Sequence, residues 1–375
     1  MSNRRAFASM TGFAAAAALA AGVGISSASA SSNWSKVTSA SAGGGMSALV
    51  AAAEKEGKLN VITLPSNWAN YGAIMKAFTA KYHIKIADAI PDGSSAQEIQ
   101  AIESDKGRSN APDVVDVGQS FAALAANQKL YAQYKVANWM AIPATDKDPK
   151  GHWYGDYGGI VSFGCDSQIV KSCPTTWSQL LSAPANSVAL NGVPGQAGAA
   201  TGAVWAAALN NGGSFTNAQP GLTFFGKLKS KGILNSTDCD SSSVVAAGSC
   251  PILINWDFLN NAKAWGLKGS LAKAWKVVDP KGTPFAESYY QAISATAPDP
   301  AAARLWEEFL YSTQGQNLFL EGLARPAEQA AMIKAKTVNE TALKQLPPVT
   351  GTVNYPTAAD ATKAGTAIAA GWPNI

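Results

Sequence analysis

The chain has 375 residues, of which 47% are hydrophobic and only 14% are charged. This length exceeds the usual size of a single core and predicts two lobes, while the composition excludes a disordered chain. The formal charge is +4, and residues 1–30 hold two arginines and no acidic residue, so the remainder carries +2. Lysines and arginines are scattered among acids, which argues against the basic stripe needed for nucleic acid or anionic membrane.

Residues 1–30 are predicted to be a signal peptide. A basic start with Arg4 and Arg5 precedes the apolar run GFAAAAALAAGVGI and a small-residue site that is most simply cleaved after Ala30. The adjacent arginines favour twin-arginine export slightly over the ordinary secretory route. The apolar run is too short for a membrane span, and no later segment offers about 18 uninterrupted apolar residues. We therefore expect a periplasmic protein.

Strand and helix patterns alternate along the chain after a Ser/Gly-rich stretch, residues 31–45, which is predicted to be a flexible leader. Such alternation predicts an α/β fold with a largely parallel sheet. Helical periodicity or capping signals are found at 46–57, 70–83, 94–108, 175–182, 196–213, 221–232, 258–266 and 299–323, and apolar strand runs at 58–64, 84–90, 113–118, 158–166, 187–195, 250–258 and 287–294.

The four cysteines fall into two near-neighbour pairs. Cys165 with Cys173, and Cys239 with Cys250, would close the shortest loops, although the sequence leaves the other two pairings open. Export makes disulfides chemically permissible. A zinc site is the alternative, and the lack of C-x-x-C spacing or of a nearby histidine disfavours it.

Motifs for catalysis are absent from the sequence. His83 and His152 are the only histidines, and there is no H-E-x-x-H, G-x-S-x-G or Walker loop. The stretch GVPGQAGAATG, residues 192–202, precedes a predicted helix. Two readings of its glycines stay open: close helix packing, or anion binding at the N-terminus of the helix.

Six segments in collinear order resemble one known family. They are LVAAAEKEGKLNVIT, MKAFTAKYHIKI, APDVVDVG, YGGIVSFGCDSQIV, TTWSQLL and AARLWEEFLYSTQGQNLFLEGL. Their order is similar to that of the extracellular solute-binding proteins of ABC importers, in the group that contains ferric-ion, polyamine, thiamine and aminoethylphosphonate receptors. The resemblance covers nearly the whole chain after the signal peptide.

The resemblance implies a two-lobed periplasmic-binding-protein type II fold with a ligand cleft between the lobes. Lobe 1 is predicted at 46–157 and 285–335, lobe 2 at 158–284, and a helical tail that packs on the lobes at 336–375. We expect a monomer without cofactor or metal that binds a small molecule and delivers it to an ABC permease in the cytoplasmic membrane. Such a receptor needs a pocket and a hinge, which agrees with the lack of catalytic motifs.

Ligands of open α/β sheets bind at the carboxyl ends of strands, so the residues that follow strands are the candidates. Ser94 and Ser95 have the alternative role of helix caps, and Asp257 that of a cap for a helix at 258–266. Of Tyr289 and the adjacent Tyr290, alternation along a strand allows only one to face the cleft. The predicted ligand-binding residues are Asn67, Trp68, Ser94, Ser95, Gln119, Tyr157, Gln196, Trp256, Asp257 and Tyr289.

The ligand is predicted to carry an amine. Trp256 and Asp257 stand where ferric-ion relatives place a pair of tyrosines, and an indole does not ligate iron. An indole beside a carboxylate suits an ammonium, because a cation–π contact contributes roughly 0.5–2 kcal/mol. Ser94, Ser95 and the helix that begins near Gln196 would instead suit an anion. A polyamine-like or zwitterionic solute is therefore the best candidate.

Alternatives from the same fold are a ferric-ion, phosphonate or thiamine receptor. The alternative from another class is a secreted hydrolase or lyase that uses carboxylates in the cleft, for which Asp156 and Asp257 are the only pair to nominate.

Overall fold

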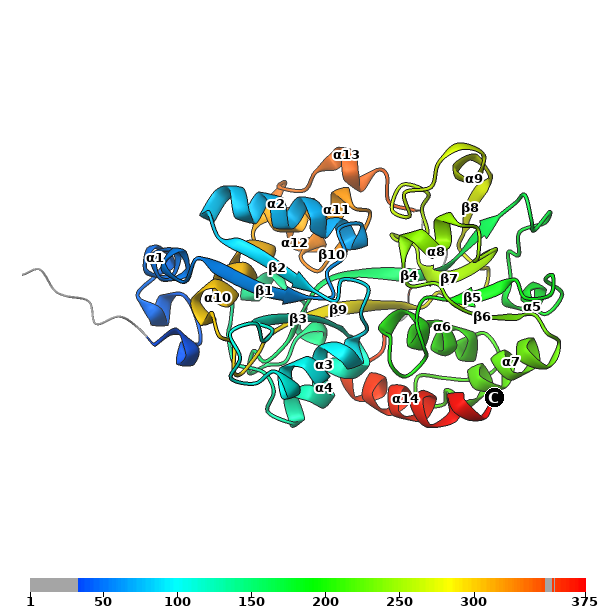
Figure 1. Ribbon diagram of the computed structural model, residues 1–375, viewed down its shortest axis with the longest axis horizontal. Coiled ribbons are helices and arrows are strands. Elements are labelled where there is room, and N and C mark those ends of the chain that lie inside the picture. Colours follow the sequence, from blue (N-terminus) through cyan, green and yellow to red (C-terminus); the bar gives the residue numbers. More distant parts are fainter. Residues whose placement is uncertain (1–32, 348–352, 354) are drawn as a thin grey trace, which may run out of the picture. The chain divides into compact units, whose positions relative to one another are not determined.

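The structure is a computed structural model that describes residues 33–347, 353 and 355–375 (Figure 1). The predicted signal peptide lies outside the described residues. Within those ranges, none of the helices is both long and apolar enough to cross a lipid bilayer. The α-helices are α1 (Met46–Glu56), α2 (Tyr71–Tyr82), α3 (Ser95–Ser104), α4 (Gln119–Asn127), α5 (Trp177–Leu180), α6 (Gly198–Leu209), α7 (Gln219–Ser230), α8 (Ser242–Ala246), α9 (Gly269–Ala274), α10 (Pro300–Leu310), α11 (Thr313–Glu321), α12 (Gln329–Ala335), α13 (Glu340–Leu343) and α14 (Ala358–Gly371).

The strands form a parallel pair and a mixed sheet. They are β1 (Lys58–Ile62), β2 (Lys85–Ala89), β3 (Val114–Gly118), β4 (Tyr154–Asp166), β5 (Val188–Leu190), β6 (Leu234–Asp238), β7 (Ile252–Trp256), β8 (Trp275–Val278), β9 (Ala286–Ile293) and β10 (Arg325–Pro326). β1 pairs with β2, and the larger sheet has the order β3-β9-β4-β7-β5-β6, with β8 and β10 also paired to β4. Parallel pairing is present in β1–β2 and in β5 with its two neighbours, whereas β4 and β9 run antiparallel to theirs. The prediction of a largely parallel sheet is therefore wrong, and the larger sheet is mixed.

β4 is the strand that joins two lobes. Residues 154–160 of β4 pair with β9, and residues 161–165 pair with β7. We call lobe 1 the part built on β1, β2, β3, β9 and the first half of β4, with helices α1 to α4 and α10 to α13. Lobe 2 is the part built on the second half of β4 and on β5 to β8, with helices α5 to α9. The predicted two-lobed α/β fold is thus confirmed, and its residue boundaries stay predictions.

The stretch predicted as a flexible leader is folded from Asn33 on. The indole of Trp34 is buried and lies where a Cβ on Gly43 would collide with it. The guanidinium of Arg304 in α10 donates to the carbonyl oxygens of Ser35 and Val37, at 3.3 and 2.8 Å. The prediction differs from the structure because one aromatic side chain anchors a segment whose average composition is typical of linkers.

Two disulfides are present in lobe 2. Cys165 at the end of β4 is bonded to Cys173, and Cys239 just after β6 is bonded to Cys250 just before β7. These are the two pairings that close the shortest loops. The second one ties together the segments that carry the edge strand β6 and the central strand β7.

No helix follows β7 where the sequence predicted one, at 258–266. The chain forms turns there instead. The amide of Asn260 donates to the carbonyl oxygens of Ser162 and Leu253, both at 3.2 Å, and the amide of Asn261 donates to the carbonyl oxygen of Phe258. Asparagine side chains that bond to backbone groups in this way compete with the helical pattern.

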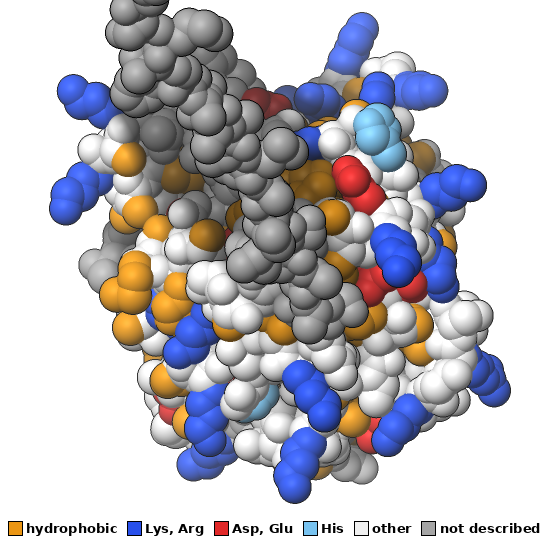
Figure 2. Space-filling model, turned by 90° about the vertical axis from the view of Figure 1, so that its left-hand side faces the viewer, with side chains coloured by type: hydrophobic (Ala, Val, Ile, Leu, Met, Phe, Trp, Pro, Cys, Tyr) orange, Lys and Arg blue, Asp and Glu red, His pale blue; other side chains and the backbone are white. Residues whose placement is uncertain are grey.

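Helix α14 contacts helices of both lobes: it packs along α4 of lobe 1 and against α6 and α7 of lobe 2. In Figure 1 it is the red helix that passes beneath these elements. Lysine and arginine side chains on the face seen in Figure 2 are scattered rather than gathered into a stripe.

Candidate functional site

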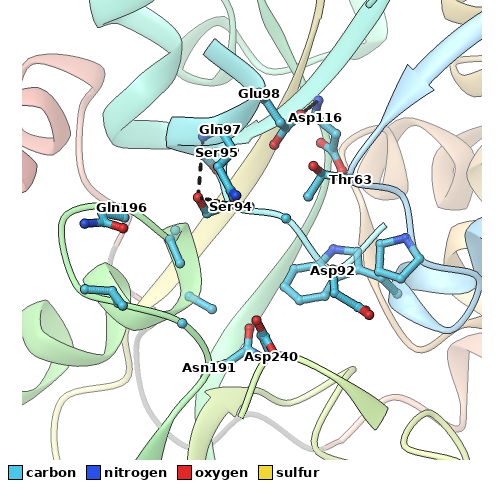
Figure 3. A pocket seen from close by; sticks show the side chains of 18 of the residues that line it. Thr63, Asp92, Ser94, Ser95, Gln97, Glu98, Asp116, Asn191, Gln196 and Asp240 are labelled. Carbon is cyan, nitrogen blue, oxygen red and sulfur yellow. Dashed lines mark hydrogen bonds between the residues drawn. The ribbon is translucent and has the colours of Figure 1, made fainter. Parts of the chain in front are cut away.

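A cavity of about 400 Å³ lies between the lobes, at the carboxyl ends of β1, β2, β3, β5 and β6 (Figure 3). Lobe 1 contributes the loops after its strands and the start of α3, and lobe 2 contributes the loops around residues 191–199 and 238–240. The lining residues are Thr63, Pro65, Trp68, Pro91, Asp92, Gly93, Ser94, Ser95, Gln97, Glu98, Asp116, Asn191, Gly192, Val193, Gln196, Ala197, Gly198, Ala199, Asp238, Asp240 and Tyr289.

The lobe 1 wall is organised by the N-terminus of α3. The Ser94 hydroxyl accepts from the Gln97 backbone N–H at 3.4 Å, and the Gln97 side chain accepts from the Ser94 N–H at 2.9 Å, which forms a capping box. The Ser95 hydroxyl accepts from the N–H of Gly118 at 3.1 Å and so ties the helix to the end of β3. This fixed start of α3 places Glu98, one turn further on, at the cavity.

Two buried carboxyl groups lie side by side on this wall. Glu98 is 1% exposed and Asp116 is 4% exposed, and Figure 3 shows both on the same side of the cavity. One Glu98 oxygen, Oε2, accepts from the Asp116 backbone N–H at 2.9 Å, and Asp116 Oδ2 accepts from the hydroxyls of Tyr71 and Tyr157 at 2.9 and 2.7 Å. The remaining oxygens, Glu98 Oε1 and Asp116 Oδ1, have no hydrogen-bond partner. A buried carboxyl oxygen without a partner is costly, and a donor from a ligand would satisfy it.

Burial keeps protons on these groups. It raises the pKa of Asp116 to about 7, although the hydrogen bonds from Tyr157 and Tyr71 act in the opposite direction. Burial, reinforced by the nearby charge of Asp116, raises the pKa of Glu98 well above its ordinary value. Near neutral pH Asp116 is therefore poised between its two charge states, and a cation in the cavity would favour the ionised form of both groups.

Two aromatic side chains flank the buried carboxyl groups. The rings of Trp68 and Tyr289 meet edge to face with centroids 5.4 Å apart. The indole N–H of Trp68 donates to the Tyr157 hydroxyl at 2.6 Å, and that hydroxyl donates in turn to Asp116. Trp68 is thus held in place through the same network that holds the carboxylate, which pre-positions an aromatic surface beside an acidic group.

The opposite side of the cavity has a more open acidic rim. Asp238 ends β6 and Asp240 follows it, and Asp92 faces them from the loop after β2. Burial, followed by the charges of Asp238 and Asp92, raises the pKa of Asp240 to about 6. Figure 3 shows Asp240 and Asn191 across the cavity from Glu98 and Asp116. Among the residues that the structure describes, the lining therefore has five carboxyl groups and no lysine or arginine.

The N-terminus of α6 also reaches the cavity, through Gly198 and Ala199. The first hydrogen bond of this helix runs from the Thr201 N–H to the Ala197 carbonyl oxygen, so the N–H groups of Gly198, Ala199 and Ala200 have no acceptor within the helix. Such a terminus carries the equivalent of about half a positive elementary charge and therefore attracts an anionic group.

The two lobes touch beside the cavity. The Ala96 N–H of α3 donates to the Gln196 carbonyl oxygen at 3.1 Å. Gly118 of lobe 1 faces Gly198 of lobe 2 so closely that a Cβ on Gly118 would lie 2.8 Å from the Gly198 Cα. This is the arrangement expected when the lobes are closed on each other.

The predicted site residues divide into two groups of five. Trp68, Ser94, Ser95, Gln196 and Tyr289 line the cavity. Tyr290, next to Tyr289, points to the other face of β9, where its hydroxyl donates to Asp146 at 2.6 Å, as strand alternation requires. The residues that do not line the cavity are Asn67, Gln119, Tyr157, Trp256 and Asp257.

The structure gives three of the outlying residues other contacts. Asn67 lies in a neighbouring surface pocket. The Gln119 side-chain amide donates to the Pro356 carbonyl oxygen at 3.1 Å, and its backbone N–H donates to Glu287 at 2.9 Å. Tyr157 is fully buried behind Asp116 and contacts the cavity lining through its hydrogen bonds with Asp116 and Trp68.

Trp256 and Asp257 also lie outside the cavity, because the end of β7 turns into the protein interior. The Trp256 indole is 1% exposed and its N–H donates to the Tyr289 hydroxyl at 3.2 Å. The Asp257 carboxylate forms an ion pair with Arg325 and accepts from the Ile160 N–H at 3.0 Å. Asp257 is therefore already neutralised by the protein and has no charge to offer a solute in the cavity.

Sequence reasoning did not find the carboxyl groups that line the cavity, Asp92, Glu98, Asp116, Asp238 and Asp240. Asp92 and Asp238 do follow or end strands and could have been nominated by that rule. Within the described ranges, no cluster of three or more His, Cys, Asp or Glu side chains could hold a metal ion.

The model of the family described as bacterial extracellular solute-binding protein matches residues 109–349. No curated protein matches the chain. The solved periplasmic binding protein AfuA from Actinobacillus pleuropneumoniae, with exogenous fructose-6-phosphate bound, is 18% identical with a TM-score of 0.64, over 84% of this chain and 97% of AfuA. An ABC transporter substrate-binding protein from Bradyrhizobium japonicum USDA 110 is 15% identical with a TM-score of 0.64, over 84% and 98% of the two chains. A periplasmic thiamin binding protein is 16% identical with a TM-score of 0.64, over 84% and 95%.

Proposed function

Because the chain belongs to the family of bacterial extracellular solute-binding proteins, we propose that it captures a small amine-bearing solute between its lobes and delivers it to an ABC permease. The solute is polyamine-like or zwitterionic, and the protein acts in the periplasm as a receptor rather than as an enzyme. The permease partner is supported by the similarity to a structure that carries the name ABC transporter substrate-binding protein.

The observation that carries the amine is the pair of unpartnered carboxyl oxygens, Glu98 Oε1 and Asp116 Oδ1, on the cavity wall. Both belong to buried groups whose pKa is raised, so each gains from a hydrogen-bond donor that also brings positive charge. An ammonium group supplies three donors and a charge in one small volume. Trp68 and Tyr289 beside it would add cation–π attraction of roughly 0.5–2 kcal/mol.

Anionic ligands are disfavoured by the same lining. Five carboxyl groups face the cavity and no lysine or arginine does, so a phosphate ester or phosphonate would meet repulsion on most sides. A phosphonate receptor is therefore an alternative of lower rank. A ferric-ion receptor also ranks lower, because no cluster of metal-ligating side chains occurs within the described ranges. Thiamine is a cation that carries an amino group, so this lining does not disfavour it. A hydrolase or lyase that uses Asp156 and Asp257 has no support from the geometry, because neither residue lines the cavity.

A zwitterion is the second candidate, and the N-terminus of α6 favours it. Its first three N–H groups precede the first helical hydrogen bond, and two of the residues that carry them line the cavity. A solute with an ammonium at Glu98 and Asp116 and a carboxylate or phosphonate at Gly198 would use both walls.

A thermal-shift screen followed by calorimetry on the exported protein tests the proposal. The screen contains putrescine and spermidine as polycations, 4-aminobutyrate and 2-aminoethylphosphonate as zwitterions, and thiamine, fructose-6-phosphate and ferric citrate as alternatives. A ligand at 100 times its dissociation constant stabilises the fold by about 2.7 kcal/mol, which is easily seen. Binding of an amine supports the proposal, and binding of the sugar phosphate or ferric citrate with no response to any amine overturns it.

A further inference from the structure

Helix α14 lies outside the segment that the family model matches, since that segment ends at residue 349. Its N-terminal half belongs to lobe 1. A capping box of Thr357 and Asp360 starts the helix, and the Gln119 amide of α4 donates to the carbonyl oxygen of Pro356. Gly365 lies against Ser120 of α4, where an added Cβ would come within 2.6 Å of the Ser120 Cβ. The helix is therefore anchored firmly on lobe 1.

The end of α14 docks on lobe 2. The Trp372 ring packs against the ring of Phe225 in α7, with centroids 5.5 Å apart. Gly371, at the end of α14, lies so close to Leu222 of α7 that a Cβ on Gly371 would collide with the leucine side chain. Phe225 is fully buried whereas Trp372 is only half-buried. This end is a smaller and more exposed contact than the one on lobe 1.

The helix also touches the back of a loop that lines the ligand cavity. A Cβ on Gly195 would lie 2.5 Å from the Cα of Ala369. Gly195 has a φ of +85° and its neighbours Val193 and Gln196 face the cavity. The backbone of this loop therefore lies between α14 on one side and the solute site on the other.

We propose that α14 and Trp372 form a clasp that holds the two lobes closed. The clasp stays bound to lobe 1 through α4, and when the lobes separate it releases lobe 2 at the contacts of Ala369, Gly371 and Trp372. Its contacts to lobe 2 exist only while the lobes are together, so they favour the closed arrangement even without a solute. Because the apparent affinity of a receptor scales with the population of its binding-competent form, the clasp raises affinity for whatever solute the cavity takes.

The test compares full-length Trp372→Ala with the wild type in the absence of added solute. Small-angle X-ray scattering is expected to give a larger radius of gyration for the variant. Hydrogen exchange of backbone amides is expected to become at least tenfold faster at 192–197 and at 366–374, and to stay unchanged at 358–364. Lys363→Ala, an exposed position on the same helix, is the matched control and should behave as the wild type.

Gly371→Ala is the second variant, for the case that removal of the indole impairs folding. Alanine favours the helix but introduces a Cβ toward Leu222, so faster exchange at 192–197 would then reflect undocking and not loss of the helix. Wild-type scattering together with wild-type exchange at 192–197 in both variants would overturn the clasp.

A final arm adds spermidine to each protein. If the solute binds, Trp372→Ala is expected to weaken its affinity severalfold, mainly through faster dissociation. If no amine binds the wild type, the proposed amine class fails, but the solute-free scattering and exchange still decide on the clasp.

Discussion

The two walls of the cavity differ in how they present charge. On lobe 1, Glu98 and Asp116 are almost completely buried and are held by backbone and tyrosine donors. On lobe 2, Asp238 is exposed and Asp240 is half-buried on a rim, and the rest of the wall is the uncharged loop at residues 191–197 and the start of α6. A buried charge is screened little by salt, whereas an exposed one is screened within about 10 Å.

This difference assigns unequal roles to the walls. The lobe 1 carboxyl groups can discriminate strongly, because an unsuitable ligand leaves them desolvated without a partner. The lobe 2 rim can attract a cation from solution but contributes little once the cation is bound. The following predictions test this inequality, and those on affinity rest on the proposed amine.

The largest effect is expected for Asp116→Asn. The substitution keeps the shape of the side chain but removes the charge that faces the cavity, which should weaken binding of putrescine or spermidine by about 2–3 kcal/mol, or roughly 30- to 150-fold. Isothermal titration calorimetry measures the change. Asp105→Asn, an acid outside the cavity that pairs with Arg108, is the control and should bind normally. Unchanged affinity in Asp116→Asn would contradict the role given to lobe 1.

A dependence on pH of similar size is expected in the wild type. The pKa of Asp116 is about 7 in the free protein, so below pH 7 a proton must leave before an ammonium can pair with the carboxylate. Affinity should fall by about tenfold per pH unit below 7, which is roughly 30-fold at pH 5.5. Titrations from pH 5.5 to 8 test this, and a profile as steep in Asp116→Asn would show that another group is responsible.

The stability of the ligand-free protein should change in the opposite direction. A carboxyl group whose pKa is raised in the fold binds more protons folded than unfolded between its two pKa values, so it stabilises the fold at low pH and loses this contribution as pH rises through the folded value. For Asp116 the window runs from the ordinary value of 3.8 to about 7. Chemical denaturation should therefore give a higher free energy of unfolding at pH 5.5 than at pH 7.5, and the difference should shrink in Asp116→Asn.

A smaller effect is expected where the walls touch. In Gly118→Ala the new Cβ would meet the Gly198 backbone at 2.8 Å, and a backbone atom cannot rotate away. The lobes should then fail to close fully, at a cost of about 1–2 kcal/mol in binding. Gly226→Ala in α7 is the control, because its Cβ would have an ordinary contact at 3.9 Å. Equal affinities in both variants would mean that the glycine contact is not part of the bound form.

The smallest effect is expected at the rim. Asp240→Asn should weaken amine binding only about two- to fivefold, and the difference from the wild type should vanish at high salt. Association rates measured by stopped flow at 20 and 500 mM salt would reveal this dependence on salt. If Asp240→Asn lost as much affinity as Asp116→Asn, the two walls would contribute equally to binding and the contrast between them would be wrong.

Local rules predicted part of the site. Trp68, Ser94 and Gln196 were found because they follow strands or precede helices, and those positions converge at one edge of a sheet. Glu98 was not found, because an acid within a helix usually faces solvent, and only the packing of α3 on β3 buries it. Asp116 was missed since it lies inside a strand run, DVVDV, where nothing in the pattern marks one acid as facing a cavity.

The fold was predictable where periodicity is strong, as in α1 to α3 and β1 to β3. Prediction failed at 33–45 and at 258–266, where single side chains decide the structure. Trp34 anchors the first segment, and the amides of Asn260 and Asn261 hold the second in turns. The structure also differs from the predicted role of Asp257 as a ligand-binding residue. Its ion-pair partner, Arg325, is 68 residues away in the sequence, so no local pattern indicates the pairing.

The contact of Gly118 with Gly198 makes two properties of a receptor independent of each other: how its lobes meet at this point, and which solute it prefers. The lobes meet there through backbone atoms, so this contact does not depend on which side chains face the solute. Substitutions at Asp92 or Asp240 could change the preferred solute over evolutionary time and leave this contact intact. A permease that recognises the closed shape would then accept each new specificity without a compensating change of its own.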